Sequence, residues 1–558
     1  MPVRQERSST DHLCASALVA TLSKKGLSDV VISPGSRNAP LTIAFTEDSS
    51  IKTHIVIDER AAAHVALGLA LETGNPAAVI CTSGTAAINH GPAIAEAFHQ
   101  KTPLISITAD RALSSLNKGH GQSIDQTELF TKFTLEDYSF NGSASTEKDI
   151  RATIEKASNI YDRALTGGPV HINVHLEEPL YGKAEALELE IPIIQARKRV
   201  CSFNFQDNPE IFQAHAHRAL VIAGPRILAD WTDQNFNSVA GISESFSGIK
   251  GHSLIASGDA FIAGEMWNTD PQLTPNCIIT IGNPTLSKSL RNWVTGLNIP
   301  HIHVGDSEGM GHDSFNTLEK SIDSEPLGWL TEFSKNIQQD KNYLKAWNRE
   351  KTRLQNIQED FSRKTSWSDL AAYKTIFESF HNTTKTTLHF ANSTSARYAL
   401  LFDFKNNIRF HANRGVAGID GCTSTAVGHA LSTSERVTLV TGDVAFFYDI
   451  NGLATVQQVP DNLRIIVINN GGGGIFRWLE GPAQVGYLES HFETKPKTSI
   501  KAAASFCGVD YFCGIDSEST HQGLIDLEKN KGTAILEITT NPELSSDIYK
   551  EFLMKLKG

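Results

Sequence analysis

The stretch from residue 437 to residue 476 constrains the fold more than any other part of the chain. Residues 437–443 and 463–470 are short, β-branched apolar runs that predict strands, and residues 448–459 have the apolar spacing of a helix that Pro460 would stop. Two strands joined by a helix form a right-handed parallel unit. The sequence therefore predicts an α/β fold built on a parallel sheet.

Two polar residues end the strands of this unit. Asp443 and Asn470 would lie together at the carboxyl ends of neighbouring strands, where open α/β sheets bind their ligands. A carboxylate, an amide oxygen and a backbone carbonyl from the glycine run are hard oxygen donors that suit Mg²⁺ holding a diphosphate. GGGGIF lacks the final glycine of the dinucleotide fingerprint, and no Gly-Lys-Ser/Thr follows for a P-loop. For this stretch alone, the alternative is an ordinary βαβ unit whose polar residues only cap turns.

Size and composition exclude several classes of protein. A chain of 558 residues is long enough for about three or four domains. Its net charge of -12 and its lack of basic runs argue against nucleic-acid binding, and no apolar run approaches the roughly 20 residues that span a bilayer. The N-terminus has no apolar signal segment, and the seven cysteines are scattered without a C-x-x-C pair. We therefore expect a cytoplasmic protein without disulfides or a zinc site.

The first and middle thirds alternate predicted strands and helices, as doubly wound domains do. Four predicted strands of the first third end in polar residues: 27–33, 54–58, 77–82 and 103–108. Glu59 follows the second of these strands, where it is either an acid of a ligand site or a helix N-terminal acid favoured by the macrodipole. A second α/β segment begins at Ala219, and its Lys288 is a candidate site residue whose alternative is an ordinary surface lysine.

A charged, helical stretch at 335–364 leads into the last third, where polar residues again gather at strand ends. The sequence therefore predicts three doubly wound α/β domains with mainly parallel sheets, at 1–187, 188–352 (with the helical linker) and 353–558.

The motifs at these strand ends resemble those of the thiamine-diphosphate enzymes. Within that superfamily the chain is similar to one branch, the synthases of 2-succinyl-5-enolpyruvyl-6-hydroxy-3-cyclohexene-1-carboxylate in menaquinone biosynthesis. The resemblance covers the first and last thirds, and SPGSR, DER with TSGT, and NRG-x-x-GIDG together are specific to this branch. The motifs that carry it are ISPGSRNAPLTIAF, DERAAAHVALGLA, ICTSGTAAINHGPAIAEA, TADR, GQSIDQ, NSTSAR, NRGVAGIDG, GDVAFFYDINGL and NNGGGGIF.

The resemblance implies a role for thiamine diphosphate. The first domain would bind its pyrimidine, with Glu59 as the acid that activates the cofactor, and the last domain would bind the diphosphate and the metal. Asp443 and Asn470 would bind Mg²⁺ or Mn²⁺ through their side chains and Gly472 through its carbonyl, while Ile419 would be the apolar wedge that bends the cofactor.

The resemblance also implies two small-molecule substrates, 2-oxoglutarate and isochorismate. The 2-oxoglutarate-derived unit would be held by Ser393, Arg397 and Arg414, in keeping with the bidentate pairing of arginine with carboxylates. The isochorismate side would be lined by Ser36, Arg37, Arg111, Gln122 and Lys288, with Ile475, Phe476 and Leu479 as its apolar wall. The enzyme would be a transferase that works as a homodimer or homotetramer, with its sites at the subunit interface.

Three positions depart from the family pattern, namely Gly121, Ser289 and Gly471, where an asparagine, a basic residue and an asparagine are usual. Three alternatives stay open at this point. The first is another thiamine-diphosphate carboligase or decarboxylase of 2-oxoacids, similar to acetolactate synthase, which would not need several strand-end arginines. The second is an inactive, cofactor-binding regulatory homologue, and the third is an NAD-binding α/β protein, which the missing fingerprint disfavours.

Overall fold

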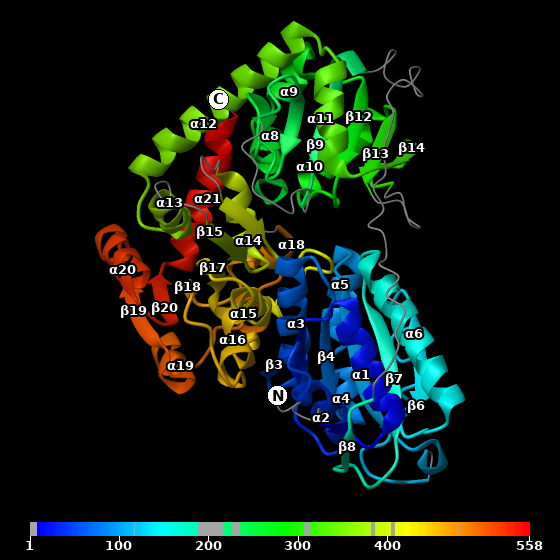
Figure 1. Cartoon of the computed structure of the whole chain (residues 1–558). Helices are drawn as coiled ribbons and strands as arrows, with labels where there is room; N and C mark the ends of the chain where they lie inside the picture. Colours follow the sequence, from blue (N-terminus) through cyan, green and yellow to red (C-terminus); the bar gives the residue numbers. More distant parts are fainter. Residues whose placement is uncertain are drawn as a thin grey trace, which may run out of the picture.

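The described residues form three parallel six-stranded sheets and one two-stranded sheet. Helices cover the three large sheets (Figure 1). The computed structural model describes residues 8–116, 118–187, 216–225, 235–305, 313–380, 386–402, 408–478 and 480–557. The predicted fold class of three doubly wound units is confirmed. We refer to the sheets with their helices as the first, central and last α/β units.

Buried apolar runs form the central strands of the first unit. Its sheet has the order β3 (Lys52–Ile55), β2 (Asp29–Ile32), β4 (Ala77–Cys81), β5 (Leu104–Arg111), β7 (Val170–Leu176) and β6 (Asp137–Asn141). Its main helices are α1 (Leu13–Lys25), α2 (Ala39–Glu47), α3 (Glu59–Thr73), α5 (Gly91–Gln100) and α6 (Glu147–Leu165). A short antiparallel pair, β1 (Ser8–Thr10) and β8 (Lys183–Glu185), lies beside this sheet.

The central unit has a different strand order. Its sheet reads β11 (Ser253–Ile255), β10 (Ala240–Ser243), β9 (Ala219–Ala223), β12 (Cys277–Ile281), β13 (His301–Gly305) and β14 (Leu318–Asp323). The helices used below are α8 (Gly258–Ala263), α10 (Lys288–Leu297), α11 (Pro326–Asn336) and α12 (Lys341–Lys364). The predicted helical linker at 335–364 thus coincides with the end of α11 and the whole of α12, and the predicted boundary at residue 352 falls inside α12.

The last unit repeats the strand order of the first. Its sheet reads β16 (Ile408–His411), β15 (Thr386–Phe390), β17 (Val437–Gly442), β18 (Leu463–Asn469), β20 (Ala534–Thr539) and β19 (Asp510–Gly514). Its helices are α13 (Asp369–Ser379), α14 (Thr394–Leu401), α15 (Cys422–Ser432), α16 (Asp443–Tyr448), α17 (Asn451–Ala454), α19 (Ile500–Cys507), α20 (Ser517–Lys529) and α21 (Pro542–Leu556). Because each crossover is parallel, the strands of this sheet end along one edge, as the sequence predicts.

Two local predictions are wrong. The helix predicted over 448–459 is replaced by the short α16 and α17, because Val456 forms an antiparallel bridge with Val56 of the first unit. The strand predicted over 54–58 stops at Ile55, and Asp58 instead caps α3 by accepting hydrogen bonds from two backbone N–H groups. Such a cap stabilises a helix by about 1 kcal/mol. A long-range contact overrides the apolar pattern in the first case, and a local helix cap does so in the second.

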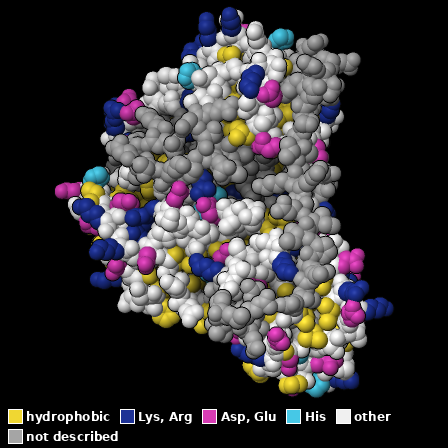
Figure 2. All heavy atoms as spheres, in the orientation of Figure 1, with side chains coloured by type: hydrophobic (Ala, Val, Ile, Leu, Met, Phe, Trp, Pro, Cys, Tyr) yellow, Lys and Arg dark blue, Asp and Glu magenta, His cyan; other side chains and the backbone are white. Residues whose placement is uncertain are grey.

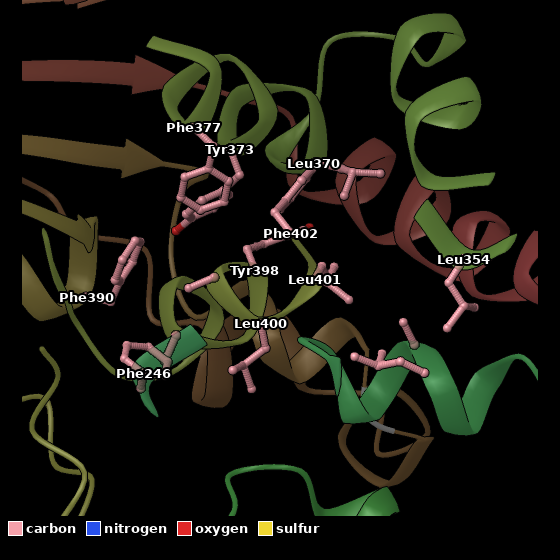
Figure 3. Packing of buried hydrophobic residues seen from close by; sticks show 14 of the residues in the cluster. Phe246, Leu354, Leu370, Tyr373, Phe377, Phe390, Tyr398, Leu400, Leu401 and Phe402 are labelled. Atoms are coloured by element: carbon pink, nitrogen blue, oxygen red, sulfur yellow. The ribbon is translucent and has the colours of Figure 1, made fainter. Parts of the chain in front are cut away.

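The last unit packs against both of the others. One continuous apolar cluster joins it to the central unit and includes Phe246, Trp347, Phe390 and Tyr398. Figure 3 shows part of this cluster, in which the rings of Phe246 and Phe390 meet edge to face with centroids 5.9 Å apart. These buried side chains fix the central unit on the last unit, where the candidate site lies.

A second apolar cluster joins the first and last units, with α3 packed against α15. The two helices cross at glycines. A Cβ on Gly68 would lie 2.1 Å from the carbonyl oxygen of Thr425, and one on Gly428 would lie 1.9 Å from that of Val65. Only glycine allows the backbones to approach this closely.

The outer surface carries charges of both signs. On the face shown in Figure 2, basic and acidic side chains are interspersed. Within the part of the chain that the structure describes, no helix is both long and apolar enough to cross a membrane.

Candidate active site

Asp443 and Asn470 lie where the sequence predicts, at the carboxyl ends of adjacent parallel strands. Strands β17 and β18 pair with Gly442 opposite Ile468, so the residues that follow the two strands are neighbours. Both side chains are buried, with 2% and 5% of their surface exposed. A buried polar pair at this edge of the sheet is the arrangement expected of a ligand site.

The Asp443 carboxylate has one oxygen free for a cation. Its Oδ1 accepts a hydrogen bond from the backbone N–H of Val444 at 2.8 Å, while Oδ2 is buried without a hydrogen-bond partner among the described residues. Burial raises the pKa of Asp443 to about 7, and the nearby backbone amides of Val444 and Gly472 oppose the shift. A cation beside Oδ2 would compensate the buried charge.

The other two predicted ligands also present oxygen. The Asn470 Nδ2 group donates to the Asp369 carboxylate at 2.8 Å, so its Oδ1 is the end that a cation would meet. The Gly472 carbonyl accepts the backbone N–H of Gly474 at 2.9 Å and keeps one lone pair. Gly472 has φ of 134°, and a Cβ there would lie 2.4 Å from the carbonyl oxygen of Glu493.

These three donors fit a hard divalent cation. They supply one carboxylate, one amide oxygen and one carbonyl, and diphosphate oxygens would complete the octahedral shell of Mg²⁺. No cluster of three or more His, Cys, Asp or Glu side chains that could hold a metal lies within the described ranges.

A cavity of about 230 Å³ lies between the central and last units. Four of the predicted substrate residues line it, and they are Ser393, Arg397, Arg414 and Ile475. The remaining lining residues are Asp259, Leu286, Ala396, Leu400 and Ala417. Two guanidinium groups in one partly apolar cavity, with the Asp259 carboxylate as the acidic member of the lining, are an arrangement that suits an organic anion.

Arg414 is held in the cavity by Asn392, which follows β15. Its NH1 donates to Asn392 Oδ1 at 2.7 Å, and the Asn392 amide donates in turn to the carbonyls of Asn413 and Gly418 at 2.7 and 2.6 Å. Burial lowers the pKa of Arg414, and its buried Nε has no partner in the described part of the chain. This guanidinium therefore keeps a donor available for an anion.

The loop that carries Arg414 is also tied to the first unit. Glu96 of α5 is 2% exposed. It accepts the backbone N–H groups of Gly415 and Val416 at 2.6 and 2.7 Å. Gln100, one turn later, donates to the carbonyl of Ala412 at 3.1 Å. The first unit thus holds the backbone of the Arg414 loop from outside the cavity.

The predicted apolar residues flank the same strand ends. Ile419 packs against Ala391, Cys422 and Ala445, between the strand ends that carry Asn392 and Asp443. Ile475 belongs to the short helix η6 (Gly474–Arg477) that follows the glycine turn, and the Phe476 ring contacts Phe492 with centroids 5.5 Å apart. Leu479 lies outside the described residues.

The predicted residues of the first unit lie apart from this cavity. Glu59 begins α3, is half-buried and accepts a hydrogen bond from Asn89 Nδ2 at 3.3 Å. Arg37 is buried and pairs with Glu178 at 3.0 Å. Ser36 is exposed in the turn beside it. None of these three residues is part of the cavity lining.

Arg111 ends β5, and its side chain reaches the loop of the first unit that carries Gln122. The Arg111 Nε group donates to the carbonyl of Gly121 at 3.0 Å, and the carbonyl of Gln122 accepts the hydroxyl of Ser83 at 2.8 Å. Gln122 has φ of 53°. Lys288, the predicted residue of the central unit, is exposed at the first position of α10, two residues after Leu286 of the cavity.

Several residues of the site carry no clear signal in the sequence. Asp259 and Leu286 line the cavity from the central unit, where the sequence suggests only Lys288. Glu244, at the end of β10, is fully buried and accepts hydrogen bonds from Thr285 and from the backbone of Leu286 at 2.9 Å. Asn392 stands in the motif NSTSAR, so a polar residue directly after a strand is the signal that could have identified it.

Comparison with known proteins decides the family. Residues 14–129 match the family described as thiamine pyrophosphate enzyme, N-terminal TPP binding domain, and residues 392–538 match its C-terminal TPP binding domain. The 2-succinyl-5-enolpyruvyl-6-hydroxy-3-cyclohexene-1-carboxylate synthase of Flavobacterium johnsoniae is 34% identical over 559 residues, covering 97% of this chain and 98% of that protein. The chain belongs to this synthase family.

Other relatives agree with this membership. The synthase of the same name from Desulfotalea psychrophila is 33% identical over 531 residues, with 93% of this chain and 96% of that protein covered. The crystal structure of benzoylformate decarboxylase from Polynucleobacter necessarius superposes with a TM-score of 0.72, covering 96% of this chain and 99% of that chain. At 18% sequence identity, that likeness shows the shared fold. The chain is thus a thiamine-pyrophosphate enzyme of the synthase family.

Proposed function

We propose that this enzyme decarboxylates 2-oxoglutarate with thiamine diphosphate and Mg²⁺ or Mn²⁺, and adds the succinyl unit to isochorismate. The products would be 2-succinyl-5-enolpyruvyl-6-hydroxy-3-cyclohexene-1-carboxylate and CO₂, in menaquinone biosynthesis. The name shared by the relatives supports the product. The structural observation that carries the proposal is the cavity in which Arg397 and Arg414 converge beside Ser393.

The cavity suits a short dicarboxylate. Arg397 and Arg414 would each pair with a carboxylate, because guanidinium groups bind carboxylates bidentately. The lining side chains of Leu286 and Leu400 would contact the methylene carbons between the charges and keep water away from them. A carboligase for small neutral 2-oxoacids does not need a second cationic group, so this cavity favours 2-oxoglutarate over the acetolactate-type alternative.

The cofactor would lie across the strand ends next to this cavity. Asp443, Asn470 and Gly472 would hold the cation and diphosphate, Ile419 would support the bent cofactor, and Glu59 would hydrogen-bond the aminopyrimidine. When bound, thiamine diphosphate supplies the carbanion chemistry, and the protein supplies position and charge. The buried, unpartnered oxygen of Asp443 supports this assignment.

We also propose that a second copy of the chain completes each site. The polar residues assigned to isochorismate come mainly from the first unit, whereas the described lining of the cavity comes from the central and last units. In a homo-oligomer, Arg37, Arg111 and Gln122 of one copy would face the cavity of another. The site would then receive the acceptor at the subunit boundary.

The two half-reactions test the assignment of the arginines. Purified protein with thiamine diphosphate and Mg²⁺ should release CO₂ from 2-oxoglutarate and form the adduct only when isochorismate is added. Losing one partner of a buried charge pair costs about 2–5 kcal/mol, or roughly 30-fold to several thousand-fold in affinity. Arg397→Ala should therefore impair CO₂ release itself, while Arg111→Ala should impair only addition to isochorismate. Preferred turnover of pyruvate over 2-oxoglutarate would support the acetolactate-type alternative and overturn the proposal.

A further inference from the structure

We propose that Asp369 is a positioning residue that sets the orientation of the Asn470 amide. In this orientation the Oδ1 atom of the amide, and not its NH₂ group, faces the cation. This inference rests on the proposed function, in which Asn470 is a metal ligand. It concerns the one ligand of the set that has two chemically different ends. An asparagine side chain binds a cation only when Oδ1, and not Nδ2, points at it.

The contact that sets this orientation is buried and direct. Asp369 and Asn470 are 2% and 5% exposed, and the Asn470 Nδ2 group donates to Asp369 Oδ2 at 2.8 Å. A carboxylate is an acceptor, so the NH₂ end of the amide must face Asp369. Asp369 is itself fixed, because its Oδ1 accepts hydrogen bonds from the hydroxyls of Thr540 and Ser545.

The chain elements that hold this contact lie far apart in the sequence. Asp369 is the first residue of α13, Thr540 follows β20, and Ser545 lies on α21. The Asp369 backbone N–H also donates to the Ser545 hydroxyl at 3.0 Å. Asp369 is therefore held from the end of β20 and from α21, and these contacts orient the amide before any cation binds.

Without Asp369, the side chains of Asn470 and Asp443 would hydrogen-bond to each other and not bind the cation. The buried Asp443 Oδ2 lacks a hydrogen-bond partner within the described residues, and Asp443 lies near enough to Asp369 for the two charges to interact. A freed Asn470 amide would turn its NH₂ group towards the Asp443 carboxylate. A charge-assisted hydrogen bond of this kind shifts an equilibrium by about tenfold or more.

The adjacent residue provides a matched control. The amide of Asn469 is also held by a carboxylate, since its Nδ2 donates to Glu537 Oε1 at 2.6 Å. Asn469 ends β18 and is not among the proposed metal ligands. Glu537→Ala therefore removes the same kind of bond one residue away. Because the Asn469 Oδ1 atom accepts the Gly471 N–H at the long distance of 3.3 Å, cation binding should change little.

The test measures Mn²⁺ binding and not turnover. Free Mn²⁺ is followed by electron paramagnetic resonance as it is titrated into the full-length protein with saturating thiamine diphosphate. We expect Asp369→Ala to weaken Mn²⁺ binding about tenfold or more, and Glu537→Ala to stay within about twofold of the parent. Equal losses in these two variants, or no loss in Asp369→Ala, would overturn the inference.

A charge exchange distinguishes orientation from general damage to the fold. Asn470→Asp alone places a second carboxylate against Asp369 and should weaken Mn²⁺ binding. Adding Asp369→Asn reverses the hydrogen bond, because its NH₂ group can donate to the new carboxylate, so the double variant should regain most of the lost affinity. Failure of this rescue would refute the positioning role. If Asn470→Ala and Asp443→Ala bind Mn²⁺ like the parent, the proposed metal site itself is wrong.

Discussion

The tie between Glu96 and the Arg414 loop predicts that a residue of the first unit controls the affinity for 2-oxoglutarate. Glu96→Gln keeps the size of the side chain but replaces one acceptor oxygen with an NH₂ group. That group would face the backbone N–H of Val416, which now donates to Oε2 at 2.7 Å, because Oε1 accepts both the Gly415 N–H at 2.6 Å and the Gln100 side chain. The substitution therefore removes one charge-assisted hydrogen bond and sets two donors against each other.

The size of the effect follows from burial on each side of the contact. Glu96 is 2% exposed, so its own side chain has no access to water, whereas Val416 is 49% exposed and its N–H can be solvated instead. The loss is then close to that of one hydrogen bond to a charged group, about 2 kcal/mol. Because this bond holds the loop that carries Arg414, the KM for 2-oxoglutarate should rise by roughly 30-fold.

Glu72→Gln is the matched control for this prediction. Glu72 is a second glutamate between the first and last units, paired with Arg409 at 3.0 Å and with His429 at 2.9 Å, and the loop of Arg414 is not among these partners. The assay is steady-state CO₂ release at varied 2-oxoglutarate, together with the thermal unfolding temperature. Both variants should unfold at lower temperature, but only Glu96→Gln should raise KM. A similar KM for the two variants would refute the reasoning.

Three further predictions concern packing, pH and the cation. Gly428→Ala should lower the unfolding temperature, because a Cβ would lie 1.9 Å from the Val65 carbonyl oxygen and overpacking costs about 1–3 kcal/mol. Gly296 lies in α10, and a Cβ there would meet no atom within 4 Å. Gly296→Ala should therefore stabilise the protein by up to about 1 kcal/mol. Burial raises the pKa of Glu244 from 4.5 to about 7, so the folded protein holds a proton that the unfolded chain loses near pH 4.5. The free energy of unfolding should therefore fall by about 3 kcal/mol as pH rises through this window, and the unfolding temperature of Glu244→Gln relative to the parent should be higher at pH 8 than at pH 5. Removing divalent cations with a chelator should abolish calorimetrically measured binding of thiamine diphosphate, and restoring Mg²⁺ should recover it; chelator-resistant binding would contradict the role given to Asp443.

The local sequence pattern was sufficient to predict the sheet edge of the last unit. The strands that end near Asp443 and Asn470 are continuous apolar runs, which buried parallel strands require, and the crossover between them has one hand. Two strand-end residues could therefore be placed side by side from the sequence. Ser393, Arg397, Arg414 and Ile475 were placed by resemblance, and the structure brings these four into one cavity.

Contacts between units could not be predicted from the local sequence pattern. The bridge between Val56 and Val456 replaces a predicted helix, although nothing near residue 456 in the sequence identifies its partner. Asp369 has the sequence signature of an ordinary helix N-terminus, because Ser368 caps α13, and its link to Asn470 arises only when the start of α13 meets the residue that follows β18. Asp259 enters the cavity for the same reason, from a unit with little family signature.

The glycine crossing of α3 and α15 sets an order of events during synthesis. Gly68 leaves the ribosome about 360 residues before Gly428, which at 5–20 residues per second is a delay of roughly 20–70 s. Throughout that time the alanine-rich face of α3, which is buried in the finished protein, has no α15 to cover it. A nascent or truncated chain that ends before residue 422 therefore exposes an apolar helix face, and it requires a chaperone or a low concentration to avoid aggregation.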